Sequence, residues 1–465
     1  MQTVKEFIEE NREAFLAHAR RLIAVDSTKG APEDGAPFGA GVHKCELEAM
    51  KIAEELGFEE VHDCEGYMAY AHVGPKDHYI GIIGHLDIVP VGDGWFHDPF
   101  DMLEKEGYIM GRGTTDDKVP LLTSMYAVKY LIDNKIPLRY GIRVLMGCDE
   151  ESGMEDLTYY LKHNEEPDFT YSPDAWFPVG NGEKGIYSSD IVSEPVDGAI
   201  VSMDGGIASN VIPDHSTVVL RGVDAGKLCR AAGDSSAYKI TEVAGDVKVE
   251  AFGKMAHAGF PWGSENSNRL VLDLVRDAGV LEGREKEIVD FFCGVLDDFL
   301  GTYLGIAGED GRFDPTTLIG GMIRKTEDGR LLLNVDSRYN TSITPEELES
   351  RISGKAASCG LEVRNVSNSG SFYISPDAEP IRVLSRSFNE VTGRNDVPYV
   401  MNGGTYARHM HNAVSFGPEM NYEVKPEWAG SPHMRDEAIS LQCVFQSIAI
   451  YAESLLGLEK LDSLK

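Results

Sequence analysis

The chain has 465 residues, which is too long for one ordinary hydrophobic core and predicts two or three domains. Its hydrophobic content of 42% is typical of a folded globular protein and argues against extensive disorder. Lys and Arg total 43 against 76 Asp and Glu, which gives a net charge of −33. We therefore expect neither nucleic acid nor membrane as a partner, because phosphate binding needs a basic surface.

Cysteine usage and the N-terminal segment bear on the compartment. The seven cysteines form no Cys-x-x-Cys pair, which predicts reduced thiols in a cytoplasmic protein. The first residues, MQTVKEFIEENREAF, are typical of an amphipathic helix rather than of a signal peptide. We find no apolar run of about 18 residues and expect no transmembrane span.

Helix-like and strand-like segments alternate through the first part of the chain. Apolar spacing predicts helices over 42–56 and 121–132, the first of which ends at a glycine. Short apolar runs at 79–83 and 140–146 predict buried strands. This alternation indicates an α/β domain with a mostly parallel central sheet and flanking helices.

The pattern changes near residue 185, after which strand-like segments dominate, and the earlier alternation returns around residue 384. We therefore predict a catalytic domain that is interrupted by an inserted α+β lid domain. The expected catalytic parts are residues 1–185 and 384–465, and the expected lid is residues 186–383.

Five short polar segments carry the candidate chemistry, and three of them follow apparent strand ends. They are Gly84 to Asp87, Gly111 to Lys118, Gly147 to Gly153, Ser172 to Ala175 and Pro432 to Glu437. In open α/β sheets, ligands bind beyond the carboxyl ends of the strands. Histidine and carboxylate ligands together suit Zn, Mn or Co rather than a thiolate-rich structural zinc.

Each segment also has a structural interpretation. A histidine and an aspartate after a strand, such as His85 and Asp87, can simply cap a loop. Asp117 is interpreted as an acidic N-cap of the helix that follows, whereas Asp116 fits either an N-cap or a bridging ligand. A helix start can explain one or two of the carboxylates at 149–151, although adjacent glutamates also suit one metal ligand and one proton carrier.

In combination, the motifs GHLD, GRGxxDDK, DEESG, SPDA, HAG and HMRDE resemble the ArgE/DapE/PepV-type metallopeptidase family over almost the whole chain. The segments at 403–408 (GGTYAR) and 334–339 (NVDSRY), with the long insertion, are most similar to bacterial PepV-type dipeptidases. The resemblance implies hydrolysis of the peptide bond of free dipeptides.

The resemblance also implies a site for two divalent metal ions, with zinc expected and manganese or cobalt as alternatives. His85 and Asp174 would bind one ion, Glu151 and His433 would bind the other, and Asp116 would bridge them. Further histidines, such as His409 and His411, are not needed as ligands and are expected to have structural or supporting roles.

The remaining roles implied by the resemblance concern catalysis and substrate. Glu150 would be the general base and acid toward a water held between the metals, Asp87 would orient His85, and His257 would stabilise the oxyanion from the lid. The carboxylate end of the substrate would be held by Asn210, Arg338, Gly403 and Gly404. Arginine suits this role because its planar guanidinium pairs with a carboxylate through two hydrogen bonds.

Two other functions remain as alternatives. An N-acyl amino acid deacylase or a carboxypeptidase would use the same ligands on the same scaffold. A non-catalytic binding protein is disfavoured, because every proposed ligand and Glu150 are present. The long insertion would supply the lid histidine within one chain, so we expect a monomer that acts on a small peptide.

Overall fold

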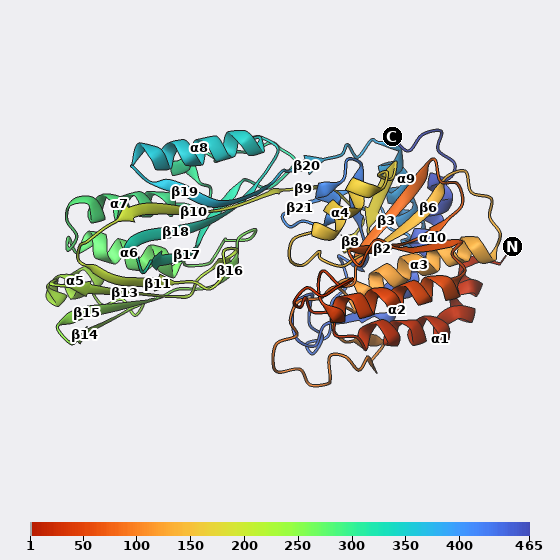
Figure 1. Cartoon of the computed structure of the whole chain (residues 1–465), viewed down its shortest axis with the longest axis horizontal. Coiled ribbons are helices and arrows are strands. Elements are labelled where there is room, and N and C mark those ends of the chain that lie inside the picture. The colour runs from red at the N-terminus through yellow and green to blue at the C-terminus, as the bar shows by residue number, and fades with distance from the viewer. Residues whose placement is uncertain (1) are drawn as a thin grey trace. The chain divides into compact units, whose positions relative to one another are not determined.

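The computed structural model describes residues 2–465, which form two compact units (Figure 1). The first unit comprises Met1–Gly182, Ile374–Tyr399 and Thr405–Lys465, and the second comprises Glu183–Tyr373 and Val400–Gly404. The chain therefore returns to the first unit before the expected boundary at residue 383, and then visits the second unit once more. β20 (Phe372–Tyr373) and β21 (Tyr399–Met401) lie where the chain passes between the units.

A mixed sheet forms the centre of the first unit. Seven of its nine strands follow the order β1 (Glu60–Asp63), β2 (Met68–Val73), β6 (Gly141–Gly147), β3 (Tyr79–His85), β7 (Phe169–Ser172), β22 (Ala413–Phe416) and β9 (Val179–Glu183). The four central strands, β6, β3, β7 and β22, are parallel, whereas the outer strands pair antiparallel. Every residue of β3 and of β6 is buried, as expected for parallel strands covered on both faces.

Six α-helices flank this sheet, and α1, α2 and α3 lie side by side in Figure 1. They are α1 (Val4–Ile23), α2 (Ala40–Leu56), α3 (Lys118–Asp133), α4 (Glu155–His163), α9 (Glu379–Thr392) and α10 (Leu441–Leu458). A capping box between Thr3 and Glu6 starts α1, and Gly57 ends α2 in the left-handed conformation that glycine favours. The helices and strands predicted between residues 42 and 146 are thus confirmed, as is the α/β class.

Shorter elements complete the first unit. β4 (Leu103–Lys105), β5 (Tyr108–Met110) and β24 (Ala438–Ser440) form a small sheet, β8 (Ala175–Phe177) pairs with β23 (Pro418–Met420), and η2 (Tyr406–His409) is a 3₁₀ helix. By length and composition, α10 is the one helix in residues 2–465 that could cross a membrane. It packs against α3 and α9 and is mostly buried, as the core helix of a folded domain is.

The second unit is built on an antiparallel sheet of eight strands. Their order is β14 (Tyr238–Val243), β15 (Asp246–Phe252), β13 (His215–Arg221), β11 (Ile200–Gly205), β17 (Thr317–Lys325), β18 (Arg330–Tyr339), β10 (Gly185–Pro195) and β19 (Glu362–Ser369). The other elements are α5 (Ala225–Ala232), α6 (Ser267–Asp277), α7 (Gly283–Val295), η1 (Thr302–Leu304), α8 (Pro345–Ser358) and the short pair β12 (Val211–Ile212) and β16 (Ala256–His257). Helices and sheet enclose one hydrophobic core that is separate from the core of the first unit.

All seven cysteines are free thiols, which agrees with the expectation of reduced cysteines. The cytoplasmic location stays a prediction.

Candidate metal centre

The ends of three neighbouring strands bring the first candidate residues together. β3 ends on His85, and β6 and β7 lie parallel to it on either side. Because the carboxyl ends of parallel strands meet at one edge of the sheet, the segments that follow β6 and β7 reach the same place. These segments carry Glu150 and Glu151 after β6 and Asp174 after β7.

Asp116 lies at the centre of the candidate ligands, and its two carboxylate oxygens face different histidines. Oδ1 lies 2.8 Å from Nε2 of His85, and Oδ2 lies 2.9 Å from Nε2 of His433. Glu151 Oε1 lies 3.0 Å from the same nitrogen of His433, and Asp174 Oδ2 lies 3.8 Å from Nε2 of His85. The five side chains form two groups that could each hold a metal ion, and Asp116 belongs to both.

The charges at this centre fit divalent cations. Burial and the neighbouring carboxylates raise the pKa of Asp174 to about 8 and raise the pKa of Glu150 well above its ordinary value. Hydrogen bonds to Asp116 and Glu151 raise the pKa of His433 to about 10. Crowded carboxylates remain ionised at neutral pH when positive charge lies among them. Two imidazoles and three carboxylates are also ligands that zinc and manganese accept.

His433 reaches this centre from the segment before β24. Its side chain is 55% exposed, whereas that of His85 is fully buried, so solvent enters from the side of His433. The backbone of His433 has a φ of 64°, in the left-handed region that non-glycine residues rarely adopt. Such a backbone is typical of positions that the surrounding structure holds for a function.

Asp117 supports β3 rather than capping α3. It occupies the N-cap position, but its side chain makes no capping hydrogen bond, and Oδ2 instead accepts the backbone N–H of His85 at 3.0 Å. Asp117 is therefore at the N-cap position that its interpretation assigned, but its carboxylate does not form the capping hydrogen bond. Gly84 makes this approach possible, because a Cβ at that position would lie 2.1 Å from Oδ2 of Asp117.

Asp87 lies behind His85 but is held mainly by a different segment. Its carboxylate accepts the backbone N–H groups of Glu150 at 3.2 Å and Glu151 at 3.1 Å. Nδ1 of His85 lies 2.9 Å from the backbone carbonyl of Asp87 and 3.4 Å from its carboxylate Oδ1. Asp87 thus joins the strand end that carries His85 to the loop that carries both glutamates.

Two residues of the quoted motifs, Arg112 and Glu437, make contacts that were not predicted from the motifs. Glu437 and Arg112 form a fully buried ion pair at 2.5 Å, and Arg112 also donates to the backbone carbonyl of His433 at 3.3 Å. Arg112 lies four positions before Asp116 and Glu437 lies four positions after His433, and this proximity to predicted ligands was the available signal. His411, by contrast, is almost fully exposed and pairs with Glu166 at 2.6 Å.

The candidate oxyanion residue lies in the second unit. His257 is in β16, where it pairs with Val211 of β12, and the N–H of the following Ala258 donates to the carbonyl of Asn210 at 2.9 Å. The backbone N–H of Gly259 donates to Nδ1 of His257 at 3.1 Å. Since Nδ1 accepts this bond, the neutral ring carries its proton on Nε2, which is thereby a hydrogen-bond donor.

The candidate carboxylate-binding residues lie in the same unit as His257. Thr317 is opposite Arg338 in the sheet, and its hydroxyl donates to the carbonyl of Ala258 at 2.9 Å, which ties β17 to the His257 segment. The guanidinium of Arg338 pairs with Asp336 at 2.9 Å. Gly403 and Gly404 lie in the 400–404 segment, which the second unit includes.

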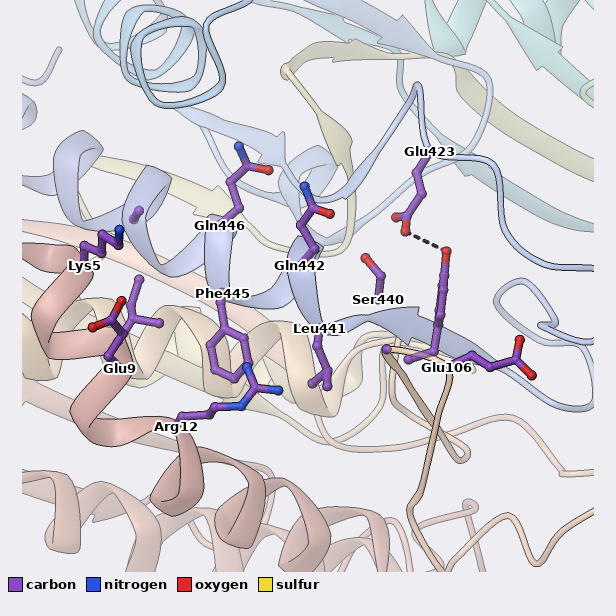
Figure 2. A pocket seen from close by; sticks show the side chains of 14 residues that line it. Lys5, Glu9, Arg12, Glu106, Glu423, Ser440, Leu441, Gln442, Phe445 and Gln446 are labelled. Carbon is purple, nitrogen blue, oxygen red and sulfur yellow. Dashed lines mark hydrogen bonds between the residues drawn. The ribbon is translucent and has the colours of Figure 1, made fainter.

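A groove of about 730 Å³ in the first unit is lined by other residues (Figure 2). Among the residues that the structure describes, its lining comes from α1, α10, the turn between β4 and β5, Glu423 and Ser440, and it includes no candidate ligand. Figure 2 shows the carboxylate of Glu423 at its edge, where it accepts the hydroxyl of Tyr108 at 2.8 Å. The thiol of Cys443 donates to the other oxygen of Glu423 at 2.8 Å, which fixes the segment that leads to His433.

Comparison with known proteins identifies the family. The model of Peptidase family M20/M25/M40 matches residues 81–457. The chain belongs to peptidase family M20/M25/M40. The resemblance seen in the motifs is therefore confirmed, and the chain is an enzyme of a peptidase family.

Relatives of this M20/M25/M40 peptidase align over nearly its full length. The Beta-Ala-Xaa dipeptidase of Lactobacillus delbrueckii subsp. lactis is 31% identical to this chain, and the alignment covers 98% of each of the two chains. The Putative dipeptidase YtjP of Bacillus subtilis (strain 168) is 29% identical, also over 98% of both chains. Human carnosine dipeptidase 1 shares the fold, with a TM-score of 0.59 at 16% identity over 98% of both chains.

Proposed function

We propose that this M20/M25/M40 peptidase is a metal-dependent dipeptidase that hydrolyses the peptide bond of free dipeptides. The observation that carries the proposal is the position of Asp116, whose two oxygens face His85 and His433 at 2.8 and 2.9 Å. Full-length relatives whose names describe dipeptidases support the substrate class.

The proposed centre takes two divalent ions, zinc first and manganese or cobalt as alternatives. His85 and Asp174 would hold one ion, Glu151 and His433 would hold the other, and Asp116, which belongs to both groups, would be shared between them. Divalent ions at such a site act as Lewis acids, which make a water more acidic and polarise the scissile carbonyl.

Glu150 is the proposed proton carrier of the reaction. Glu150 is half-buried, and desolvation, together with the neighbouring carboxylates of Asp174 and Glu151, holds its pKa well above the ordinary value. A base of raised pKa can take the proton of the attacking water and return it to the leaving amine. Asp87 positions Glu150 by accepting its backbone N–H at 3.2 Å.

The second unit supplies the proposed substrate contacts. His257 donates from Nε2 to the oxyanion, and the bond from Gly259 to Nδ1 keeps the proton on Nε2. Arg338, with Asn210 and the backbone of Gly403 and Gly404, holds the substrate's carboxylate. Asp336 fixes the guanidinium of Arg338 at 2.9 Å and leaves further N–H donors for the substrate.

A substrate panel tests this proposal. Metal-free enzyme is reloaded separately with Zn²⁺ and with Mn²⁺ and assayed on free dipeptides, N-acyl amino acids and tripeptides. One dipeptide carries an N-terminal β-alanine, since a relative bears the name Beta-Ala-Xaa dipeptidase. We expect the free dipeptides to be hydrolysed fastest. Faster turnover of N-acyl amino acids would favour a deacylase, and metal binding without turnover would favour a binding protein.

We also infer that the enzyme is a cytoplasmic monomer. The chain that carries the metal ligands also carries His257, and the sheet of its second unit is already eight strands wide. We propose that His257 serves the metal centre of its own chain, so that no partner copy is needed to provide the oxyanion donor. Sedimentation analysis should give a mass near 51.0 kDa, and an obligate dimer would contradict the inference.

A further inference from the structure

Glu437 lies four positions after His433 in the sequence and is fully buried. Its carboxylate nevertheless accepts hydrogen bonds from the loop that precedes α3. Oε1 accepts three backbone N–H groups, from Gly113 at 3.2 Å, Thr115 at 2.7 Å and Asp116 at 3.1 Å. One oxygen atom therefore binds three backbone N–H groups of the turn that ends at Asp116.

The second oxygen and the backbone of Glu437 complete the connection. Oε2 accepts from Nη1 of Arg112 at 2.5 Å, and Nη2 of Arg112 donates to the carbonyl of His433 at 3.3 Å. The backbone carbonyl of Glu437 accepts the N–H of Gly111 at 3.0 Å and the hydroxyl of Thr114 at 3.1 Å. Glu437 thus contacts the backbone of Asp116 directly and the backbone of His433 through Arg112.

We propose that Glu437 is a positioning residue that sets the metal centre, because its Oε1 fixes the backbone of Asp116 relative to His433. This inference rests on the proposed two-metal function. Asp116 must present one oxygen to each group of ligands, so a small rotation of its backbone would misplace both oxygens. Outer contacts of this kind typically change metal affinity about 10- to 100-fold when they are lost.

An alternative role for Glu437 is only to neutralise the buried guanidinium of Arg112, and the two roles predict opposite results for two substitutions. Glu437→Gln keeps an oxygen at the same reach but removes the negative charge. Glu437→Asp keeps the charge but is one methylene shorter, which withdraws the oxygen from the three N–H groups. A positioning oxygen tolerates Gln and not Asp, whereas a neutralising charge tolerates Asp and not Gln.

The experiment measures Mn²⁺ binding to the metal-free full-length protein by titration calorimetry. Wild type is measured first and should bind two ions per chain; if it binds none, the proposed function fails, not the role of Glu437. We expect Glu437→Gln to bind within about threefold of wild type and Glu437→Asp to lose tenfold or more for at least one ion. The reverse order of the two variants, or equal affinity in both, would overturn the inference.

A matched pair removes the influence of the buried charge. Arg112→Met with Glu437→Gln retains the acceptor, and Arg112→Met with Glu437→Met lacks it, while neither leaves a guanidinium unpaired. Thermal unfolding of the metal-free proteins shows whether each variant is folded. We expect weaker Mn²⁺ binding only where the acceptor is missing, and equal binding by the two would contradict the role of Oε1. If the second double variant does not fold, the comparison of Gln with Asp decides.

Discussion

The carboxylate of Asp87 accepts the backbone N–H of Glu150 at 3.2 Å. This bond spans two strand ends, because Asp87 follows β3 and Glu150 follows β6. The proposed general base is therefore positioned through its backbone by the residue that lies behind His85.

Replacing Asp87 by Ala should lower kcat about 10- to 100-fold, because the loop that carries Glu150 and Glu151 loses its two anchoring bonds. Steady-state kinetics on a dipeptide would measure the loss. Asp87→Asn is the matched control, since its single amide oxygen can keep one of the two bonds, and it should retain more activity than Asp87→Ala. Equal activity in wild type and Asp87→Ala would contradict the positioning role.

Glu150→Ala should lower turnover about 10²- to 10⁴-fold while leaving metal content nearly unchanged, because Glu150 is proposed to move protons rather than to bind metal. Metal analysis of the purified variant, beside its kinetics, separates the two roles. Loss of one metal per chain would instead make Glu150 a ligand. Near-normal activity would rule out the proposed role in proton transfer.

His257→Ala should lower kcat about 10²- to 10³-fold with little effect on metal binding, since it removes one donor to the oxyanion. His257→Gln is the control, because its amide NH₂ can replace the Nε2 donor in part. A change confined to KM would show that His257 binds the substrate equally in the ground state and the transition state.

Metal affinity should rise with pH. Hydrogen bonds to Asp116 and Glu151 raise the pKa of His433 to about 10, so the metal-free protein carries a proton on this ring at neutral pH. A metal ion must displace that proton, and the carboxyl of Asp174, whose pKa is raised to about 8, must lose its proton as well. The apparent affinity should therefore rise at least about tenfold per pH unit between pH 6 and about 8. Calorimetry in two buffers of different ionisation enthalpy would detect the released proton. Affinity that is independent of pH from 6 to about 8 would contradict this prediction.

The sequence predicted the parts of the centre that follow from strand ends. His85, Glu150, Glu151 and Asp174 come together because β3, β6 and β7 are parallel neighbours, a consequence of local apolar runs and their alternation with helices. The fold class followed from the same pattern.

Contacts between distant segments could not be predicted from the sequence in this way. Asp117 matched a common N-cap pattern, yet its carboxylate accepts a hydrogen bond from the backbone N–H of His85, 32 positions away. The bonds of Glu437 to the turn before α3 span 321 to 324 positions. Likewise, residues 400–404 belong to the second unit although a helix-strand pattern surrounds them. Periodicity describes neighbours along the chain, whereas these contacts depend on tertiary packing.

The positions of the proposed ligands along the chain also imply an order of assembly during synthesis. His85, Asp116, Glu151 and Asp174 leave the ribosome before the inserted second unit, and His433 leaves it afterwards. A growing chain that has not reached residue 433 holds the group of His85, Asp116 and Asp174 but lacks the imidazole of the other group. Under the proposed function, a chain that has not yet reached residue 433 would offer at most one complete ion site and would not be expected to hydrolyse dipeptides.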